Sequence, residues 1–406
     1  MSSSSPSKVA VIGGGPAGLM AAEVLSSAGA SVTVYDRMPS LGRKFLMAGR
    51  GGLNLTHSEP LDRFLRRYGP ATERLRGMIE AFPPKALIKW AEGLGQQTFV
   101  GSSGRVFPKA MKASPLLREW LKQLEAQGVA FRPRRTWTGW TDAGELKFAG
   151  PEGDEVVRAD AVIMALGGGS WAKLGSDGRW TTAFEGAGAR ITPFRPSNVG
   201  FLVPWSEVFK ERFAGTPLKA VGLTFAGRQV KGEIMLSAYG LEGGGIYALS
   251  SALRDAVEGQ GEAVLEIDLR PDLSAGQIEN KLARGRKGES VANLLRKALN
   301  LSPAAIGLLR EACGVNLPAT PTALAALVKA APVKLTGCAP MDRAISTAGG
   351  VSLDSVNADL MLKARPGVFL AGEMLDWEAP TGGYLLQASF ATGRAAALGV
   401  LAYLRN

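Results

Sequence analysis

The sequence predicts an α/β protein with a discontinuous Rossmann-like domain, an inserted antiparallel β domain and a small helical domain. Three observations support this fold class. The chain opens with a strand that runs into a glycine-rich turn at residues 8–18, and residues 366–393 return to the same α/β texture. Between them, residues 197–237 alternate apolar and polar side chains as antiparallel strands do, and a series of short helical patterns follows.

The N-terminal strand, turn and helix carry a dinucleotide-binding fingerprint. Gly13 permits the tight turn, Gly15 lets the backbone approach a pyrophosphate, and Gly18 allows the helix that begins near Pro16 to pack closely. The pyrophosphate would lie on the helix N-terminus, where unpaired amides favour anions. Asp36 ends the next strand, where its carboxylate can accept hydrogen bonds from an adenosine ribose. The fingerprint predicts a dinucleotide but does not distinguish FAD from NAD.

Composition limits the classes of protein to consider. The chain has 406 residues, enough for two or three domains, and 46% of them are hydrophobic. No apolar run reaches the length of a bilayer span, and residues 1–5 do not begin a signal peptide, so we expect a cytoplasmic protein without a membrane partner. The two cysteines, Cys313 and Cys338, are too few and too far apart for dithiol chemistry or a zinc ribbon. We therefore expect no metal site.

The net charge of +11 raises the question of nucleic-acid binding. Basic residues are dispersed, and the densest segments, 63–67, 132–135 and 284–287, are not interleaved with aromatic side chains that could stack on bases. We interpret the charge as solvated surface and expect a small-molecule substrate rather than a nucleic acid. An anionic substrate, cofactor phosphates and an RNA partner stay open as alternatives, and the sequence does not predict the oligomeric state.

Within the first half of the chain, helices are expected at 16–27, about 72–93 and 114–128. Residues 158–166 form a continuous apolar strand of the buried parallel kind. Residues 167–172 match GxGxxA, but the turn-forming residues after them argue against a second nucleotide fingerprint. We instead expect the strand end, with Ala165, Gly167 and Gly168, to lie with its backbone against a bound cofactor.

The middle of the chain forms the predicted insertion. We place the nucleotide-binding domain at 1–190 and 353–406, the antiparallel β domain at 191–270 with return strands at 333–352, and the helical domain at 271–332. Ser302-Pro303 and Thr320-Pro321 are typical helix starts, because a capping hydroxyl precedes a proline in the first turn. An insertion between two halves of a nucleotide-binding domain is the usual place for a substrate lid.

The C-terminal segment supplies a second helix start. After the strand at 366–373, Thr381 is expected to cap the last helix, and Gly382 and Gly383 leave bare amides at the positive end of its dipole. Such an end can stabilise a developing negative charge, as at the pyrimidine edge of a reduced flavin. The small side chains between 388 and 397 let this helix lie close to a sheet.

Five segments together resemble the bacterial family of FAD-dependent flavoproteins that includes aminoacetone oxidase and bile-acid-type enone reductases. They are GGGPAG, GRKFLMAGRGGLNLTH, ALGGGSWAKLGSDG, GEIMLSAYGLEGGG and AGEMLDWEAPTGGYLLQASFATG, in this order along the whole chain. The resemblance implies FAD in a domain of the glutathione-reductase type. The implied and motif-based cofactor contacts are Gly13, Gly15, Pro16, Ala17, Gly18, Asp36, Arg37, Arg43, Lys44, Gly51, Asn54, Ala165, Gly167, Gly168, Gly372, Glu373, Thr381, Gly382, Gly383, Leu385 and Leu386.

The chain departs from this family pattern at two places. Where relatives read SGxGRCN, the family's arginine and cysteine positions are Gly52 and Leu53, so thiol chemistry in that loop cannot apply. Where relatives show a Thr-His pair, the chain has Ser237-Ala238 followed by Tyr239. These departures predict a distinct subfamily whose substrate differs.

The catalytic residues are not determined by the sequence. His57, the single histidine, and the tyrosines Tyr239 and Tyr384 are weak candidates, because a hydrogen-bonded or packed structural role is the commoner fate of such side chains. Asp376 and Glu378 flank a tryptophan near the expected flavin edge and could bind an amine or cap a turn.

Three functions follow as hypotheses. The first is an FAD-dependent oxidoreductase that oxidises a small organic substrate, such as an amine or aminoketone, and passes electrons to oxygen or another acceptor. The second reverses the electron flow: NAD(P)H, docking transiently, reduces the flavin, which then saturates a carbon–carbon double bond. The third is a flavin-containing RNA-associated or regulatory protein.

Overall fold

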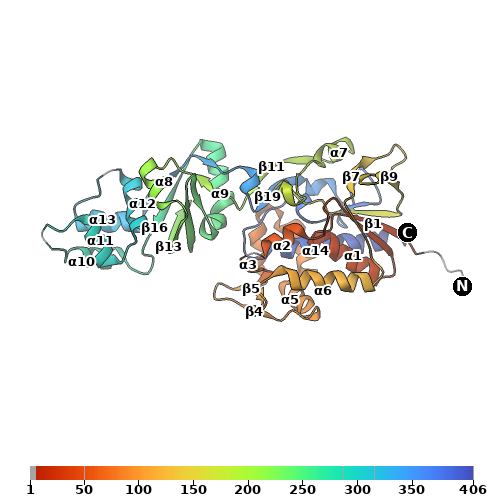
Figure 1. Ribbon diagram of the computed structural model, residues 1–406, viewed down its shortest axis with the longest axis horizontal. Helices are drawn as coiled ribbons and strands as arrows, with labels where there is room; N and C mark the ends of the chain where they lie inside the picture. The colour runs from red at the N-terminus through yellow and green to blue at the C-terminus, as the bar shows by residue number, and fades with distance from the viewer. Residues whose placement is uncertain (1–5, 50, 287, 315, 406) are drawn as a thin grey trace. The chain divides into compact units, whose positions relative to one another are not determined.

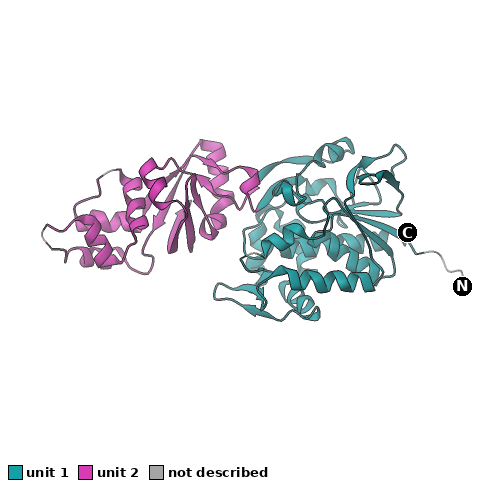
Figure 2. Ribbon diagram, viewed as in Figure 1, with its two compact units in different colours: residues 1–195, 346–406 teal, residues 196–345 magenta. Residues whose placement is uncertain are grey.

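The computed structural model describes residues 6–49, 51–286, 288–314 and 316–405. It divides the chain into two compact units, shown in Figure 2: unit 1 comprises residues 1–195 and 346–406, and unit 2 comprises residues 196–345. Unit 1 is therefore discontinuous, and unit 2 is inserted between its two segments.

Unit 1 is built on a five-stranded parallel sheet with the order β20-β10-β1-β2-β6. Its strands are β1 (Lys8–Ile12), β2 (Ser31–Asp36), β6 (Ala130–Pro133), β10 (Ala161–Met164) and β20 (Val368–Leu370). The C-terminal strand β20 pairs with β10, with Val162 beside Val368 and Met164 beside Leu370. The two distant segments of the chain thus complete one sheet.

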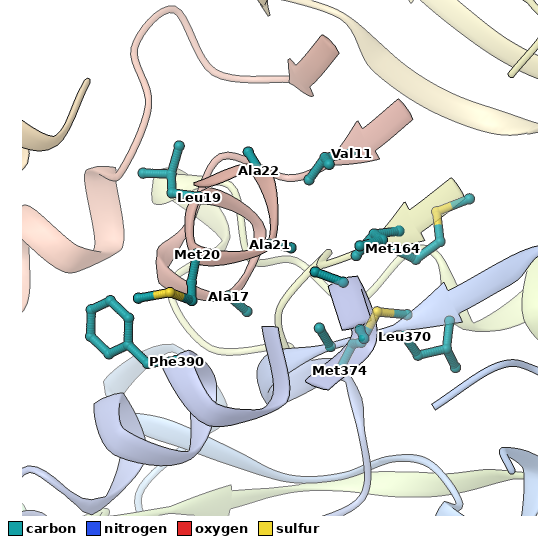
Figure 3. Packing of buried hydrophobic residues seen from close by; sticks show 14 of the residues in the cluster. Val11, Ala17, Leu19, Met20, Ala21, Ala22, Met164, Leu370, Met374 and Phe390 are labelled. Atoms are coloured by element: carbon teal, nitrogen blue, oxygen red, sulfur yellow. The ribbon is translucent and has the colours of Figure 1, made fainter. Parts of the chain in front are cut away.

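Two helices pack together beside this sheet, α1 (Pro16–Ser27) and α14 (Tyr384–Tyr403). The two helices can approach closely because Gly393 has no side chain. A Cβ at this position would lie only 2.2 Å from the carbonyl oxygen of Ala17. Figure 3 shows Leu19, Met20 and Phe390 in the shared core. Among the described residues, α14 is the one helix long and apolar enough to cross a bilayer, and 56% of its apolar window is buried, as expected of a core helix.

The remaining elements of unit 1 surround the sheet and the α1–α14 pair (Figure 1). They are α2 (Arg43–Ala48), β3 (Thr56–His57), α3 (Leu61–Leu65), α4 (Thr72–Ala81), α5 (Pro84–Gly93), β4 (Thr98–Val100), β5 (Arg105–Pro108), α6 (Ala113–Ala126), β7 (Thr136–Trp140), β8 (Leu146–Gly150), β9 (Gly153–Val157), α7 (Thr181–Gly186), β11 (Ile191–Ser197) and β19 (Ser346–Val351), with short 3-10 turns at 66–71, 172–174, 353–355 and 372–374. β11 begins in unit 1 and pairs with β19.

Unit 2 carries a seven-stranded sheet with the order β17-β16-β13-β14-β15-β12-β18 and antiparallel pairings. Its strands are β12 (Phe201–Leu202), β13 (Thr216–Phe225), β14 (Arg228–Ser237), β15 (Gly240–Glu242), β16 (Ala263–Asp268), β17 (Ala331–Leu335) and β18 (Gly337–Cys338), and its helices are α8 (Glu207–Phe213), α9 (Gly244–Gln260), α10 (Ala275–Leu282), α11 (Val291–Leu299), α12 (Pro303–Cys313) and α13 (Pro321–Lys329). One apolar cluster joins the sheet and the helices, so the β and helical parts of the insertion form one compact unit.

Several local expectations need correction. The helix expected over 72–93 is two helices, because Pro83 and Pro84 end α4 and begin α5. The helix expected to start at a Ser114 cap starts at Ala113 instead. Thr381 does not cap the last helix: the N-cap is Gly383, whose φ of 94° suits a residue without a Cβ. The caps at Ser302 and Thr320 are confirmed, since each side chain accepts a backbone N–H of the first turn.

Candidate functional site

A cavity of about 720 Å³ opens within unit 1, next to the residues that follow β1, β2, β10 and β20. This edge, where parallel strands end, is where α/β proteins bind ligands. The cavity brings together more than half of the predicted cofactor residues, from four separate segments: Gly13, Gly15, Pro16, Ala17, Asp36, Arg37, Arg43, Lys44, Ala165, Gly167, Gly372 and Glu373.

The glycine-rich turn has the shape that a dinucleotide cradle requires. Gly13 has a φ of +108°, and a Cβ there would lie 2.2 Å from the carbonyl oxygen of Ala165. A Cβ at Gly15, by contrast, would meet no atom within 4 Å, because this glycine borders the cavity. The backbone at Gly15 is therefore open to a ligand at the N-terminus of α1, where amides and the helix dipole favour an anion.

The Asp36 carboxylate is held by the backbone at the end of β2. One of its oxygens, Oδ2, accepts the Gly14 N–H at 2.7 Å, and the other accepts the Met38 N–H at 2.8 Å. Burial raises the pKa of Asp36 against the opposing effect of these hydrogen bonds. Each oxygen keeps a second lone pair, so the side chain can still accept a hydroxyl from the cavity.

A second wall of the cavity comes from segments that sequence reasoning missed. Arg37 forms an ion pair with Asp177, which lies in the loop after β10. The same wall includes Trp137 from β7 and Trp180 before α7. The loop 167–178 was predicted to touch a cofactor through its glycines, but no local pattern indicates that Asp177 pairs with Arg37 or that β7 joins the wall. Within the described residues, Trp137 and Trp140 each keep a buried indole N–H without a partner.

A polar network closes the cavity on the side of the C-terminal segment. The Lys44 Nζ lies 2.6 Å from Glu373 Oε2 and 2.9 Å from the Ser170 hydroxyl. The other oxygen of Glu373 accepts the backbone N–H of Thr347 at 3.0 Å. The Thr347 hydroxyl in turn accepts the N–H groups of residues 169 and 170. This network ties α2, β19 and the loops after β10 and β20 together around the cavity.

The other predicted cofactor residues lie outside the cavity wall, and they are Gly18, Gly51, Asn54, Gly168, Thr381, Gly382, Gly383, Leu385 and Leu386. Some of them have a visible packing role. A Cβ at Gly18 would lie 1.9 Å from the Gly13 carbonyl oxygen, and one at Gly383 would lie 2.4 Å from Thr56 Cα. In the orientation that satisfies both neighbours, the Asn54 side chain donates to the Thr56 carbonyl and accepts the Gly383 N–H.

The three weak catalytic candidates are all engaged. The His57 Nδ1 accepts the Glu59 N–H at 3.1 Å, and its Nε2 donates to the Ser103 carbonyl at 3.0 Å, so both ring nitrogens are used in structural bonds. The buried Tyr384 donates its hydroxyl to Glu59 at 2.6 Å. Tyr239 belongs to unit 2, where it donates to Glu242 at 2.5 Å, and burial together with this bond raises the tyrosine's pKa.

Comparison with known proteins places this geometry in a family. Residues 7–399 match the family described as the HI0933-like protein Rossmann domain. The chain belongs to the HI0933-like family. A 3-dehydro-bile acid delta(4,6)-reductase of Clostridium scindens is 28% identical, over 95% of this chain and 97% of the relative. A ribosomal RNA dihydrouridine synthase of Haemophilus influenzae is 23% identical, over 96% and 97%.

Solved structures show the same fold as this HI0933-like chain. A 3-ketosteroid delta1-dehydrogenase from Sterolibacterium denitrificans superposes with a TM-score of 0.55 at 13% identity, covering 98% of this chain and 100% of that one. The open conformation of a flavocytochrome c3 fumarate reductase gives 0.50 at 16% identity, covering 99% and 79%. The predicted family and fold class are therefore confirmed.

The residues of the HI0933-like cavity fit FAD. The open backbone at Gly15 and the start of α1 can hold a pyrophosphate, and Asp36 can accept a ribose hydroxyl. The cavity also extends to Glu373 and to Ser389 of α14, well past the adenosine end. Family membership and this fit together support FAD as the cofactor. Among the described residues, no group of three or more His, Cys, Asp or Glu side chains could hold a metal ion.

Proposed function

We propose that this protein is an FAD-dependent oxidoreductase that reduces a carbon–carbon double bond conjugated to a carbonyl group. The observation that carries the proposal is the cavity of unit 1 in a chain that a bile-acid delta(4,6)-reductase and a ribosomal RNA dihydrouridine synthase match over 95% and 96% of its length. A 3-dehydro-bile acid with delta(4,6) unsaturation has double bonds conjugated to its 3-keto group, and dihydrouridine is uridine saturated beside its C4 carbonyl. The two relatives thus share one type of reaction on different substrates.

In this reaction one carbon of the double bond receives a hydride and its neighbour receives a proton. NAD(P)H is the proposed electron donor and leaves as NAD(P)⁺. Bound FAD supplies the hydride-transfer chemistry between donor and substrate. The protein's residues bind and orient it: the turn at Gly15 and the start of α1 hold the pyrophosphate, Asp36 holds the ribose, and the Lys44–Glu373 pair fixes the wall towards α14.

Oxidation of an amine or aminoketone stays a prediction that the comparisons do not favour. A uridine in RNA is a second candidate substrate, because two dihydrouridine synthases, of Haemophilus influenzae and Escherichia coli, match at 23% and 24% identity. The net charge of +11 would attract an RNA substrate, but the dispersal of the basic residues along the chain counts against this second candidate.

One experiment separates these alternatives. The purified protein is checked for an oxidised flavin spectrum and mixed anaerobically with NADH or NADPH. The reduced enzyme then receives a delta(4)-3-ketosteroid, a uridine-containing ribosomal RNA fragment or aminoacetone. We expect NADH or NADPH to bleach the flavin spectrum. Either the ketosteroid or the RNA fragment should then restore the colour of the oxidised flavin and yield a product that is heavier than the substrate by two hydrogens. Bleaching of the oxidised enzyme by aminoacetone, with peroxide on re-aeration, would instead establish the oxidase. A protein that cannot be loaded with FAD would refute the proposal.

A further inference from the structure

A charged cluster surrounds the first turn of α14 in unit 1. The Tyr384 hydroxyl donates to Glu59 Oε1 at 2.6 Å. Arg67 binds the same carboxylate through two bonds, Nε to Oε1 at 3.0 Å and Nη2 to Oε2 at 2.7 Å, and its guanidinium carbon lies 5.7 Å from the centre of the Tyr384 ring. The His57 ring stacks on the Tyr384 ring, with 5.5 Å between the ring centres.

The same turn is held at its backbone. The Tyr68 hydroxyl donates to the Tyr384 carbonyl oxygen at 2.8 Å. Three residues further along the helix, the Gln387 side chain is fully buried. Its amide oxygen accepts the Thr56 hydroxyl at 2.8 Å, and its amide nitrogen donates to the Phe82 carbonyl at 2.6 Å. These contacts come from segments more than 300 positions earlier in the chain. They leave the start of α14 little freedom to move.

The charges of the cluster are unequally exposed. The Glu59 side chain is 9% exposed and the Arg67 side chain 47%. Burial alone would raise the pKa of Glu59, but the bonds from Arg67 and Tyr384 outweigh it and hold this pKa below its usual range. Glu59 therefore stays a carboxylate at neutral pH, and Arg67 balances its charge close to the positive end of the α14 dipole.

We propose that Glu59 and Arg67 are positioning residues that fix and electrically balance the first turn of α14, and thereby set the reduction potential of the bound cofactor. The inference rests on the proposed function. The cavity reaches α14 at Ser389, whose hydroxyl donates to the Leu385 carbonyl at 2.8 Å in the first turn. The N-cap residue, Gly383, has no side chain that could accept the N–H groups of this turn. A charge that alters the field of this turn acts on negative charge developing where Ser389, one helical turn further along α14, lines the cavity.

Removal of the two charges is expected to shift the reduction potential of the cofactor in opposite directions. Glu59→Gln leaves Arg67 unbalanced, and the added positive field stabilises a reduced, anionic cofactor, so its potential rises. Arg67→Gln leaves the Glu59 carboxylate unbalanced, so the potential falls. A cluster that served only to hold the helix in place would give shifts of one sign, because both variants would loosen the same turn.

The test uses the full-length, FAD-loaded protein. Its reduction potential is measured by equilibration with reference dyes, and FAD content and thermal unfolding are measured in parallel. Variants Glu59→Gln and Arg67→Gln are compared with Arg67→Lys, which keeps the charge. The matched controls are Glu73→Gln and Arg76→Gln, which break an exposed ion pair of the same composition in α4. Because Arg67 is half exposed, its variants are expected to fold even if Glu59→Gln does not.

We expect the equilibrium with the dye to shift roughly threefold to tenfold in opposite directions for Glu59→Gln and Arg67→Gln, with little change for Arg67→Lys or the controls. Shifts of the same sign, no shift for Arg67→Gln, or an equal shift for Arg67→Lys would overturn the inference while leaving FAD binding intact. A wild-type protein that takes up no FAD overturns the proposed function, and the inference with it.

Discussion

Gly18 lies directly on Gly13, so closely that a Cβ at position 18 would stand 1.9 Å from the Gly13 carbonyl oxygen. This contact seats α1 on the turn that follows β1. Gly15, three residues before Gly18, has an ordinary φ of −87° and no atom within 4 Å of a Cβ position. The two glycines of one motif therefore serve different purposes: Gly18 builds the turn and Gly15 leaves room for a ligand.

Substitution by alanine should separate these purposes. We expect Gly18→Ala to destabilise the protein by about 1–3 kcal/mol, because the methyl group must displace backbone. Gly15→Ala should leave the unfolding of the FAD-free protein unchanged and weaken FAD binding at least about tenfold, since the methyl group enters the cavity beside the expected pyrophosphate. Denaturant unfolding and FAD titration by fluorescence measure the two effects. Unchanged FAD affinity in Gly15→Ala would show that the pyrophosphate lies elsewhere.

Asp36 should affect both the turn and the cofactor. Asp36→Ala removes the acceptor of two backbone N–H groups, those of Gly14 and Met38, and we expect a loss of about 1–3 kcal/mol in unfolding free energy together with weaker FAD retention. Asp36→Asn keeps one acceptor and should lie between wild type and alanine. Asp160→Ala is the matched control: Asp160 accepts the Lys8 N–H at the opposite end of β1, so FAD retention should not change. Equal FAD retention in all three variants would contradict the ribose assignment.

The Lys44–Glu373 pair is predicted to matter more than an exposed pair. The two side chains are 28% and 14% exposed, and Lys44→Met would leave the carboxylate with the Thr347 N–H alone. We expect a loss of about 1–3 kcal/mol in urea unfolding. In the control variant Lys334→Met, which breaks the exposed pair with Glu262, the loss should be below about 1 kcal/mol. Comparable losses in the two variants would show that the pair in the cavity wall behaves as surface charge.

What the sequence could predict was local chemistry. The strand, turn, helix and acidic residue from Lys8 to Asp36 follow one another in the chain, and the local backbone conformation accounts for the residue type at each key position. The same holds for the caps at Ser302 and Thr320. The proline pair that divides α4 from α5 is equally local, but the apolar periodicity continues across it and therefore indicates a single helix.

The rest of the site depends on contacts between distant segments. Asp177 meets Arg37 across 140 positions, and Tyr384 meets Glu59 across 325. No spacing rule links such residues, so the second cavity wall and the cluster at α14 could not be inferred. His57 illustrates the same limit: as the single histidine beside a cofactor loop it attracts a catalytic role, yet only its bonds to the Glu59 and Ser103 backbones reveal a structural one.

A last prediction concerns Glu23, a partly buried carboxylate of α1. It accepts the indole N–H groups of Trp90 at 3.1 Å and Trp120 at 2.5 Å and the Gln123 amide at 3.1 Å. Burial raises its pKa, and the three hydrogen bonds oppose this only in part. A carboxyl group whose pKa is raised on folding adds stability that is complete below its unfolded pKa, about 4.3, and lost as the pH rises through the folded value.

The unfolding free energy of the wild type relative to Glu23→Gln should therefore decrease as the pH rises from the unfolded pKa of Glu23 through its raised folded pKa. Glu59 provides the opposite case, because its pKa is lowered on folding. The unfolding free energy of the wild type relative to Glu59→Gln should therefore increase as the pH rises through the lowered folded pKa of Glu59 towards its unfolded pKa. Urea unfolding of the three proteins across the acid range measures both slopes. Parallel slopes would mean that burial does not dominate at Glu23, since the two carboxylates would then respond to pH in the same way.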